Sequence, residues 1–457
     1  MVRSPVEYLR KLLYFNGHRL LVDSDLGGAY RCIYEADQIG FSQRDLTLLL
    51  DRLLKHCQKS VPYYQHLMAE MGYQDWEDPQ VFLSRFPILT KEKIRQNFDS
   101  LRSEDLENRN WAYNSSGGST GEPIRLIQDR QFTDYQMAIQ WLSFNWAGRN
   151  LGEPAVHLWG SERDILHQTI SLQKRILNRL TNDRYLNAFL MTPEKMRSYL
   201  QSLNSHPPKL IIAYVQSIYE LAQFAISEHI TVTPQEAVMT SAGTLYPFMR
   251  ERIEAVFHCK VFNRYGSREV GDIACECSAH AGLHVFPWGN YIEIVDDQGK
   301  RVPNGVEGNI LVTNLNNYAM PLVRYAIGDR GVLSESEQCS CGREGQILDR
   351  VSGRNVDVFV KRDGTLVDGE YFTHLLYYKD WVQKFQVVQK DYSSVLFKIQ
   401  KTQNNYQPWE IDEIKAKTRV VMGEDCIVDF EFPKEIPPSR SGKYSYTITE
   451  VGQGARQ

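Results

Sequence analysis

Short apolar runs alternate with longer amphipathic stretches along most of the chain, and their spacing predicts strands and helices in turn. Residues 41–110 are predicted to be mainly helical, with the apolar-rich stretch 45–54 as an example. The elements predicted after them are helix 131–149, strands 155–159 and 210–214, helix 217–228, strand 237–241, helix 247–257 and strand 260–262. Such alternation predicts an α/β fold, with sheet layers covered by helices.

The last third of the chain follows another pattern. Residues 290–333 are predicted to form a meander of short strands joined by turns rich in Gly, Asn and Pro. Beyond Gly353, strands near 385–400, a helix near 408–421 and a strand near 427–432 predict a small α+β unit. We therefore expect two domains, residues 1–353 and 354–457.

Length and charge narrow the class of protein. The 457 residues, 42% of them hydrophobic, suffice for a sizeable core and two or three folding units. A formal net charge of -4 gives no sign of nucleic-acid binding. The first residues contain no apolar signal core, and no run of about 18 apolar residues predicts a membrane span. We expect a cytoplasmic protein; the oligomeric state stays open, with a homodimer as one option.

A glycine- and hydroxyl-rich loop, residues 113–123, is the strongest chemical signal. Its glycines allow close backbone approach, and its hydroxyl groups can donate to phosphate oxygens. It lacks the Gly-Lys-Ser/Thr ending of a Walker loop, and the strand-like residues 124–127 follow it where a helix would be needed. A plain turn or linker can have the same composition. The candidate phosphate-binding residues are Ser115, Ser116, Gly117, Gly118, Ser119, Thr120 and Gly121.

Three further segments carry candidate ligand-binding side chains. Residues 263–271 follow a predicted strand, where ligands of α/β sheets gather, and offer Tyr265 to cover a planar ring and Glu269 to bind Mg²⁺. Asp329, at a glycine turn, can accept hydrogen bonds from sugar hydroxyls, and Lys443 follows a proline-framed loop. Each segment alone is more typical of a solvated turn, a capped turn or a surface lysine.

Together and in this order, the four segments resemble the motifs of the adenylate-forming superfamily. More narrowly, the chain resembles the phenylacetate-coenzyme A ligase family and its CapK-like branch of capsular polysaccharide biosynthesis proteins, and the resemblance extends to residues 61–64 and 86–91. It implies a large, multi-sheet N-terminal adenylation domain. It also implies a small, mobile α+β C-terminal domain that carries the catalytic lysine, with a hinge near residues 361–362.

The resemblance assigns roles to single residues. The loop 115–121 would order the β- and γ-phosphates of ATP, Glu269 would hold Mg²⁺, and Lys443 would reach the α-phosphate and the carboxylate. Tyr265 would lie against adenine, while Asp329 would bind the ribose. The implied cofactor-binding residues outside the loop are Tyr265, Gly266, Ser267, Asp329 and Arg354. The implied catalytic residues are Thr120, Glu269 and Lys443.

The implied reaction has two steps. A small carboxylic acid and MgATP would give acyl-AMP and pyrophosphate, and coenzyme A would then displace AMP. Two alternatives stay open: an amine or sugar acceptor, as in an amide ligase or a polysaccharide-modifying enzyme, or a nucleotide-binding relative that has lost catalysis.

The cysteines give a separate signal. Four of the eight lie in two Cys-x-Cys pairs, which offer ligands suited to tetrahedral Zn²⁺. The favoured zinc ligands are Cys277, His280, Cys339 and Cys341, with Cys275 and His284 as substitutes. The alternative is a set of free buried cysteines, because the two pairs lie far apart in the sequence. A zinc ion with four protein ligands would be structural.

Overall fold

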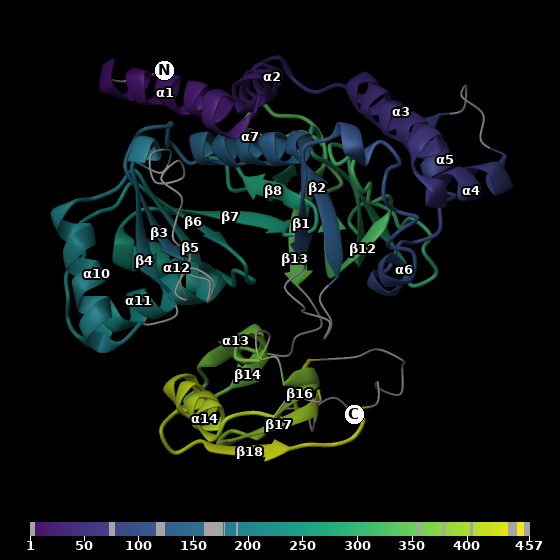
Figure 1. The fold of residues 1–457 in the computed structure, drawn as a ribbon. Helices are drawn as coiled ribbons and strands as arrows, with labels where there is room; N and C mark the ends of the chain where they lie inside the picture. The colour runs from purple at the N-terminus through teal and green to yellow at the C-terminus, as the bar shows by residue number, and fades with distance from the viewer. Residues whose placement is uncertain are drawn as a thin grey trace. The chain divides into compact units, whose positions relative to one another are not determined.

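The computed structural model divides into two compact units (Figure 1). The larger unit comprises Met1–Asn114 and Leu126–Ser352, and the smaller unit comprises Ser115–Arg125 and Gly353–Gln457. The structure describes residues 5–72, 78–115, 124–159, 177, 179–188, 191–353, 358–376, 379, 381–402, 405–436 and 446–451.

An eleven-stranded sheet forms the centre of the larger unit, in the order β10-β11-β12-β13-β9-β8-β7-β6-β5-β3-β4. The strands from β7 to β4 run parallel to one another, whereas β8 pairs antiparallel with β7 and opens an antiparallel region. The parallel strands are β3 (Ala155–Trp159), β4 (Asp183–Asn187), β5 (Leu210–Tyr214), β6 (Ala237–Ser241) and β7 (Lys260–Ser267). The others are β8 (Gly271–Glu276), β9 (Leu283–Val285), β10 (Asn290–Val295), β11 (Gly308–Asn314), β12 (Tyr325–Leu333) and β13 (Ile347–Gly353).

Helices cover both faces of the parallel strands, as the continuous apolar runs of those strands require. In β5, Ile212 packs into the core that includes α7, whereas Ile211 and Ala213 pack into the core on the other face, with α10, α11 and α12 (Figure 1). Successive side chains of a strand point to opposite faces, so one strand supplies both cores. The helices are α7 (Arg130–Trp146), α10 (Pro193–Ser205), α11 (Val215–Ser227) and α12 (Pro247–Phe257).

The N-terminal part is mainly helical, as predicted for residues 41–110. Its helices are α1 (Pro5–Val22), α2 (Leu26–Ile39), α3 (Gln43–Ser60), α4 (Pro62–Met71), α5 (Pro79–Leu83), α6 (Lys91–Gln96) and the 3₁₀ turn η1 (Leu106–Asn108). The two-stranded sheet of β1 (Trp111–Ser115) and β2 (Arg125–Asp129) follows. Among the helices of the described residues, none has the length and apolar character needed to cross a membrane.

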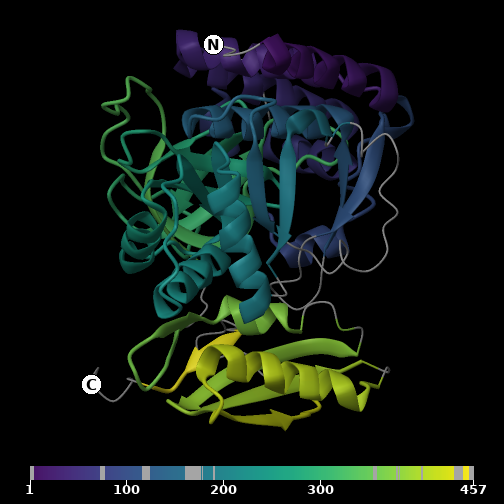
Figure 2. The ribbon, with the colours of Figure 1, turned by 90° about the vertical axis from the view of Figure 1, so that its left-hand side faces the viewer.

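The smaller unit is an α+β fold. Its four-stranded sheet has the order β18-β17-β16-β19, and β14 pairs with β15 in a separate hairpin. Helix α14 packs on the sheet through Ile414 and Met422, and Figure 2 shows it lying along the strands. The elements are β14 (Val358–Val360), β15 (Leu366–Asp368), α13 (Glu370–His374), β16 (Val382–Asp391), β17 (Ser394–Lys401), α14 (Pro408–Met422), β18 (Ile427–Glu431) and β19 (Thr447–Thr449).

Two expectations differ from these elements. Strand β7 does not end at residue 262 but continues to Ser267, because Arg264 and Tyr265 pair with Cys275 and Ala274 of β8. The first half of the 263–271 motif is therefore strand. Residues 361–362, expected near a hinge, belong to the turn between β14 and β15 inside the smaller unit. The pivot between the domains stays a prediction.

Candidate active site and candidate metal centre

The turn between β7 and β8 presents the first group of candidate residues. Tyr265, Gly266 and Ser267 end β7, and Glu269 lies in the turn before β8. At Gly266 the backbones approach so closely that a Cβ atom would lie 2.7 Å from the carbonyl oxygen of Gly271. Glycine has no Cβ, so it permits this close strand pairing just before the turn that carries Glu269.

Tyr265 and Asp329 lie side by side. The Tyr265 hydroxyl donates a hydrogen bond of 2.7 Å to Oδ2 of Asp329, a buried residue of β12. This bond joins the segments expected to bind adenine and ribose, which are 64 positions apart in the sequence. The two side chains therefore have the proximity that recognition of one nucleoside needs.

Glu269 is a buried carboxylate, and among the described residues Lys91 is paired with it. Its exposed fraction is 4%, and its Oε1 lies 3.8 Å from Nζ of Lys91, the equally buried first residue of α6. The Tyr325 hydroxyl donates to the same oxygen at 3.4 Å. A buried carboxylate is stable when a cation or hydrogen-bond donors balance it, and carboxylate oxygens are preferred ligands of Mg²⁺. Glu269 therefore fits the metal-binding role expected of it.

The β1–β2 hairpin is tied to the same turn. Asn114 Nδ2 donates to Gln128 Oε1 at 2.8 Å, and Gln128 Nε2 donates to the carbonyl oxygens of Arg268 at 2.9 Å and Glu269 at 3.4 Å. These hydrogen bonds, donated by side-chain amides, hold the stem of the glycine- and serine-rich loop against the backbone that carries Glu269.

Part of the predicted site lies outside the described residues. Ser115 is described and ends β1. The predicted site residues that lie outside are Ser116, Gly117, Gly118, Ser119, Thr120, Gly121, Arg354 and Lys443. The roles expected of them stay predictions.

Three thiols and one imidazole form a second cluster. The ligand atoms of Cys277, His284, Cys339 and Cys341 all lie within 4.8 Å of one another. Cys277 Sγ is 3.8 Å from Cys339 Sγ, and Cys341 Sγ is 3.6 Å from His284 Nε2. With Zn–S near 2.3 Å and Zn–N near 2.0–2.1 Å, a tetrahedron has S–S and S–N edges of about 3.8 Å and about 3.6 Å. Both distances fit tetrahedral coordination.

His284 takes the place in this cluster that we expected for His280. Strand β9 pairs antiparallel with β8 and sets His284 opposite Cys275, two residues before Cys277, so residue 284 lies on the face of Cys277. His280 lies in the turn between these strands with a φ of 51°, and its Nδ1 is 3.2 Å from Glu276 Oε2. The spacing Cys-x-x-His pointed to His280, whereas the register of the β8–β9 hairpin places His284 in the cluster.

Cys275, the other substitute, stays outside the four-residue cluster. Its thiol is buried and donates to the carbonyl oxygen of Glu276 at 3.4 Å.

The surroundings of the cluster shift the pKa values of two of its members. Burial raises the pKa of Cys277 to about 12. Burial and the nearby Arg343 lower the pKa of His284 to about 4, so its imidazole is neutral at pH 7, the form that binds metals.

A phenylacetate-coenzyme A ligase of Thermus thermophilus is 30% identical to this chain over 367 residues, which cover 74% of this chain and 76% of that protein. The chain belongs to the phenylacetate-coenzyme A ligase family. It is also 23% identical to Protein CapK of Staphylococcus aureus over 412 residues, 88% of each chain. Residues 359–450 match the CapK C-terminal domain. The resemblance stated from the motifs is thereby confirmed.

The fold agrees with this family. A crystal structure of 2-hydroxyisobutyryl-CoA ligase in complex with 2-HIB-AMP and CoA matches with a TM-score of 0.59 at 18% identity, over 92% of this chain and 91% of that one. This likeness confirms the expected α/β fold class with a small second domain.

Two residues that contact Glu269 in the candidate site were given no role from the sequence. Lys91 lies in a segment that carried the resemblance, but a lysine at a helix start gives no sign that it will be buried beside a carboxylate. Gln128 is one polar residue of an alternating strand. Only the folded chain brings Lys91 and Gln128 to Glu269.

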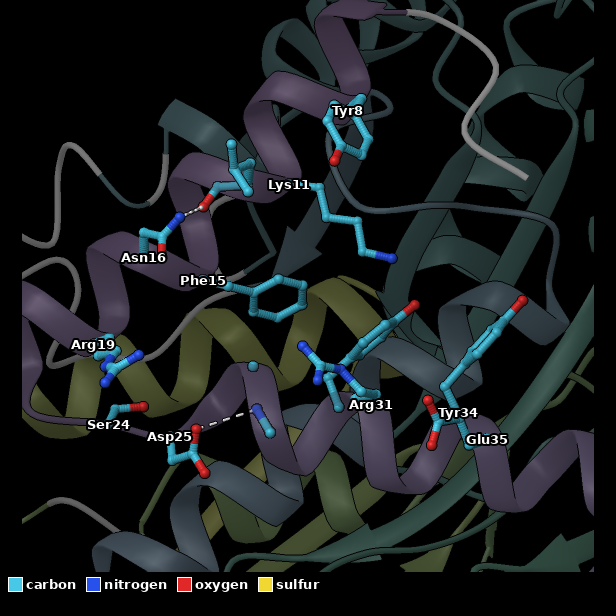
Figure 3. Close-up of a pocket in the computed structure, with 14 residues that line it drawn as sticks. Tyr8, Lys11, Phe15, Asn16, Arg19, Ser24, Asp25, Arg31, Tyr34 and Glu35 are labelled. Atoms are coloured by element: carbon cyan, nitrogen blue, oxygen red, sulfur yellow. Dashed lines mark hydrogen bonds between the residues drawn. The ribbon is translucent and has the colours of Figure 1, made fainter.

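A cavity of about 400 Å³ lies elsewhere in the larger unit, between α1 and α2 (Figure 3). Phe15 and Tyr30 line it, and Lys11 Nζ lies 4.7 Å from the centre of the Tyr30 ring. Of the described motif residues, none lines this cavity. The family motifs therefore locate the candidate active site at the β7–β8 turn.

Proposed function

We propose that the protein is an AMP-forming ligase that activates a small carboxylic acid with MgATP and transfers the acyl group to coenzyme A. One observation carries the proposal: two contacts join β12 to the segment 265–269. Asp329 of β12 accepts a hydrogen bond from Tyr265, and Tyr325 of β12 donates one to buried Glu269. The contacts among residues matched to adenine, ribose and metal binding support their assignment to one site. Membership of the phenylacetate-coenzyme A ligase family supports the same chemistry.

In the first step, a carboxylate oxygen of the acid attacks the α-phosphorus of ATP. The bond from that phosphorus to the bridging oxygen breaks, and pyrophosphate leaves with its electron pair. Negative charge accumulates on the phosphoryl oxygens, so catalysis depends on positioning and on cations and N–H donors. We assign loop 115–121 to the distal phosphates and Lys443 to the α-phosphate. Mg²⁺ held by Glu269 would supply charge neutralisation.

The described residues would position the nucleotide. The Tyr265 ring would cover adenine, while its hydroxyl orients the Asp329 carboxylate, which would accept hydrogen bonds from the ribose hydroxyls. Gln128 would keep the phosphate loop in register with Glu269, because its amide joins the hairpin stem to the β7–β8 turn. These contacts would preorganise the nucleotide-binding side chains before ATP binds.

In the second step, the sulfur of coenzyme A attacks the acyl carbonyl, a thioester forms and AMP leaves. The phenylacetate-coenzyme A ligases among the relatives support this acceptor. An amine or a sugar hydroxyl stays the second candidate acceptor, as the resemblance to the CapK-like branch of polysaccharide biosynthesis proteins implied.

The test is an ATP–pyrophosphate exchange screen of the purified full chain with aryl, fatty and amino acids. We expect Mg²⁺-dependent exchange with at least one acid, and with that acid a thioester product and AMP release on addition of coenzyme A. AMP release that requires an amine or a sugar and ignores coenzyme A would replace the proposed acceptor. Protein that binds ATP but exchanges with none of the acids would refute acid activation.

A further inference from the structure

We propose that Cys277, His284, Cys339 and Cys341 bind one structural Zn²⁺, which fastens the loop 334–346 to the β8–β9 hairpin. This site lies outside the ligase chemistry and does not depend on it. Three thiolates and one imidazole are a ligand set that tetrahedral zinc prefers.

Local structure in both segments prepares the ligands. In the loop, the amide of Gly342 donates to the carbonyl oxygen of Cys339 at 2.9 Å, and Gly342 has a φ of 86°. This tight turn spans residues 339–342 and therefore contains both loop cysteines. In the hairpin, the pairing of β8 with β9 sets His284 beside Cys277. Two local geometries, formed by segments distant in sequence, therefore converge on one point.

The cluster lies at the opposite end of β8 from the nucleotide motifs. Strand β8 starts two residues after Glu269 and ends at Glu276, immediately before Cys277. Its six residues, at a rise of about 3.3 Å each, separate the two ends by about 20 Å. A metal at the cluster could not contact ATP bound at the β7–β8 turn. With four protein ligands it would also have no open position for a substrate.

Contacts around the cluster show what the metal would hold in place. Arg343, in the same loop, donates from Nε and Nη2 to Asp37 of α2 at 2.9 Å and 3.1 Å. Its guanidinium lies 4.3 Å from the centre of the Trp146 ring of α7. Trp146 Nε1 in turn donates to Asp37 at 3.3 Å, and its ring centre lies 5.8 Å from that of His284.

The loop is therefore clamped from two sides. The metal would attach it to the sheet, and Arg343 attaches it to the helices through Asp37 and Trp146. Strand β13 begins at Ile347, directly after this loop, and runs to Gly353, the first residue of the C-terminal segment of the smaller unit. The zinc site would fix the start of the strand that leads into that unit.

The experiment measures zinc and thiol reactivity in the purified full chain, without reference to ligase activity. We expect one zinc per chain in the wild-type protein. A thiol reagent should leave Cys277, Cys339 and Cys341 unmodified until a strong chelator is added, and Co²⁺ substitution should give a tetrahedral spectrum with thiolate charge-transfer absorption.

Two matched variants test the ligand assignment. His284→Ala should lose its zinc on dialysis. His280→Ala should retain zinc, because His280 contacts Glu276 and is not one of the four proposed ligands. Arg343→Gln should keep the ligands but lower zinc affinity about tenfold, as loss of a group that supports metal ligands does. A zinc competition assay with a chromophoric chelator measures all three.

Wild-type protein without zinc, both as isolated and after incubation with Zn²⁺, would overturn the proposal, as would freely reactive Cys277, Cys339 and Cys341. Zinc retained in His284→Ala but lost in His280→Ala would overturn the ligand set. The wild-type measurements decide the matter even if a variant fails to fold. None of them uses the exchange assay, so failure of the zinc site and failure of the ligase proposal are distinguishable.

Discussion

The two ends of strand β8 carry sites of opposite design. At its start, Glu269 and the pair Tyr265–Asp329 are assembled from several segments and are expected to act on ligands that come and go. At its end, the ligand atoms of Cys277 and its three partners lie within 4.8 Å of one another, a set of protein atoms proposed to surround one metal ion. An open set of side chains suits chemistry, whereas a closed set suits stability.

The comparison teaches that burial alone does not distinguish the site proposed to be reactive from the one proposed to be structural. Glu269 and Cys277 are both buried. The two residues differ in their partners among the described residues. Glu269 has Lys91 at 3.8 Å and the Tyr325 hydroxyl at 3.4 Å, whereas Cys277 has thiol and imidazole partners close enough to share a single metal ion. We therefore expect changes at the two ends of β8 to alter different measured quantities.

The largest effect is expected at the open end. Glu269→Gln keeps the size of the side chain but removes the charge proposed to hold Mg²⁺. Loss of one such stabilising group lowers turnover by about 10²–10³-fold. The acid-dependent ATP–pyrophosphate exchange rate measures this, with exposed Glu251→Gln as the matched control. If Glu269→Gln exchanges as fast as the control, Glu269 does not have the role assigned to it.

Zinc removal should lower the stability of the fold, and it should change the exchange rate less than Glu269→Gln does. A ligand that binds only the folded chain stabilises it by about 2.7 kcal/mol at a hundredfold excess over its Kd. Chelation should therefore lower the Tm, while the exchange rate per folded molecule at low temperature stays near the untreated value. Calorimetry and exchange assays on one sample check both. An immediate loss of exchange without a change in Tm would place the metal in the reaction.

Lys91→Met should lower the Mg²⁺ concentration needed for exchange. Two unit charges about 4 Å apart attract by about 4 kcal/mol at an effective dielectric constant of 20, and the metal must compete with this attraction for Glu269. If the metal regains about a third of this attraction energy when Lys91 is removed, its affinity rises about tenfold. The half-saturating Mg²⁺ concentration should therefore fall about tenfold. Lys93→Met, on the same helix, is the control. A rise would mean that Lys91 assists metal or phosphate binding.

Tyr265→Phe should have the smallest effect. The ring that is proposed to cover adenine is retained, and only the hydrogen bond to Asp329 is lost, worth about 1 kcal/mol or about fivefold. We expect KM for ATP to rise about fivefold with little change in kcat. Steady-state kinetics beside Tyr392→Phe, an exposed tyrosine, measure it. An unchanged KM would show that the orientation of Asp329 does not depend on Tyr265.

The sequence predicted best those elements whose structure depends mainly on their own residues. Strands 155–159, 210–214 and 237–241 match β3, β5 and β6 at every residue, because buried parallel strands are continuous apolar runs between turns. The end of β7 was missed because its last residues are polar and owe their strand conformation to pairing with β8.

The candidate site divides in the same way. Tyr265, Glu269 and Asp329 could be proposed as site residues from the sequence because their motifs are local in sequence. Lys91 was given no role because its burial beside Glu269 is a product of tertiary packing. His280 was chosen over His284 because spacing within a turn does not reveal strand register, which only the β8–β9 pairing fixes.

The most direct test of acid activation compares Lys443→Ala with Lys434→Ala, an exposed lysine nine positions earlier, in carboxylate-dependent ATP–pyrophosphate exchange. The account predicts exchange at the wild-type rate in Lys434→Ala. In Lys443→Ala it predicts exchange near background with ATP binding retained, because the cation proposed for the α-phosphate is gone. Equal exchange in the two variants would contradict it.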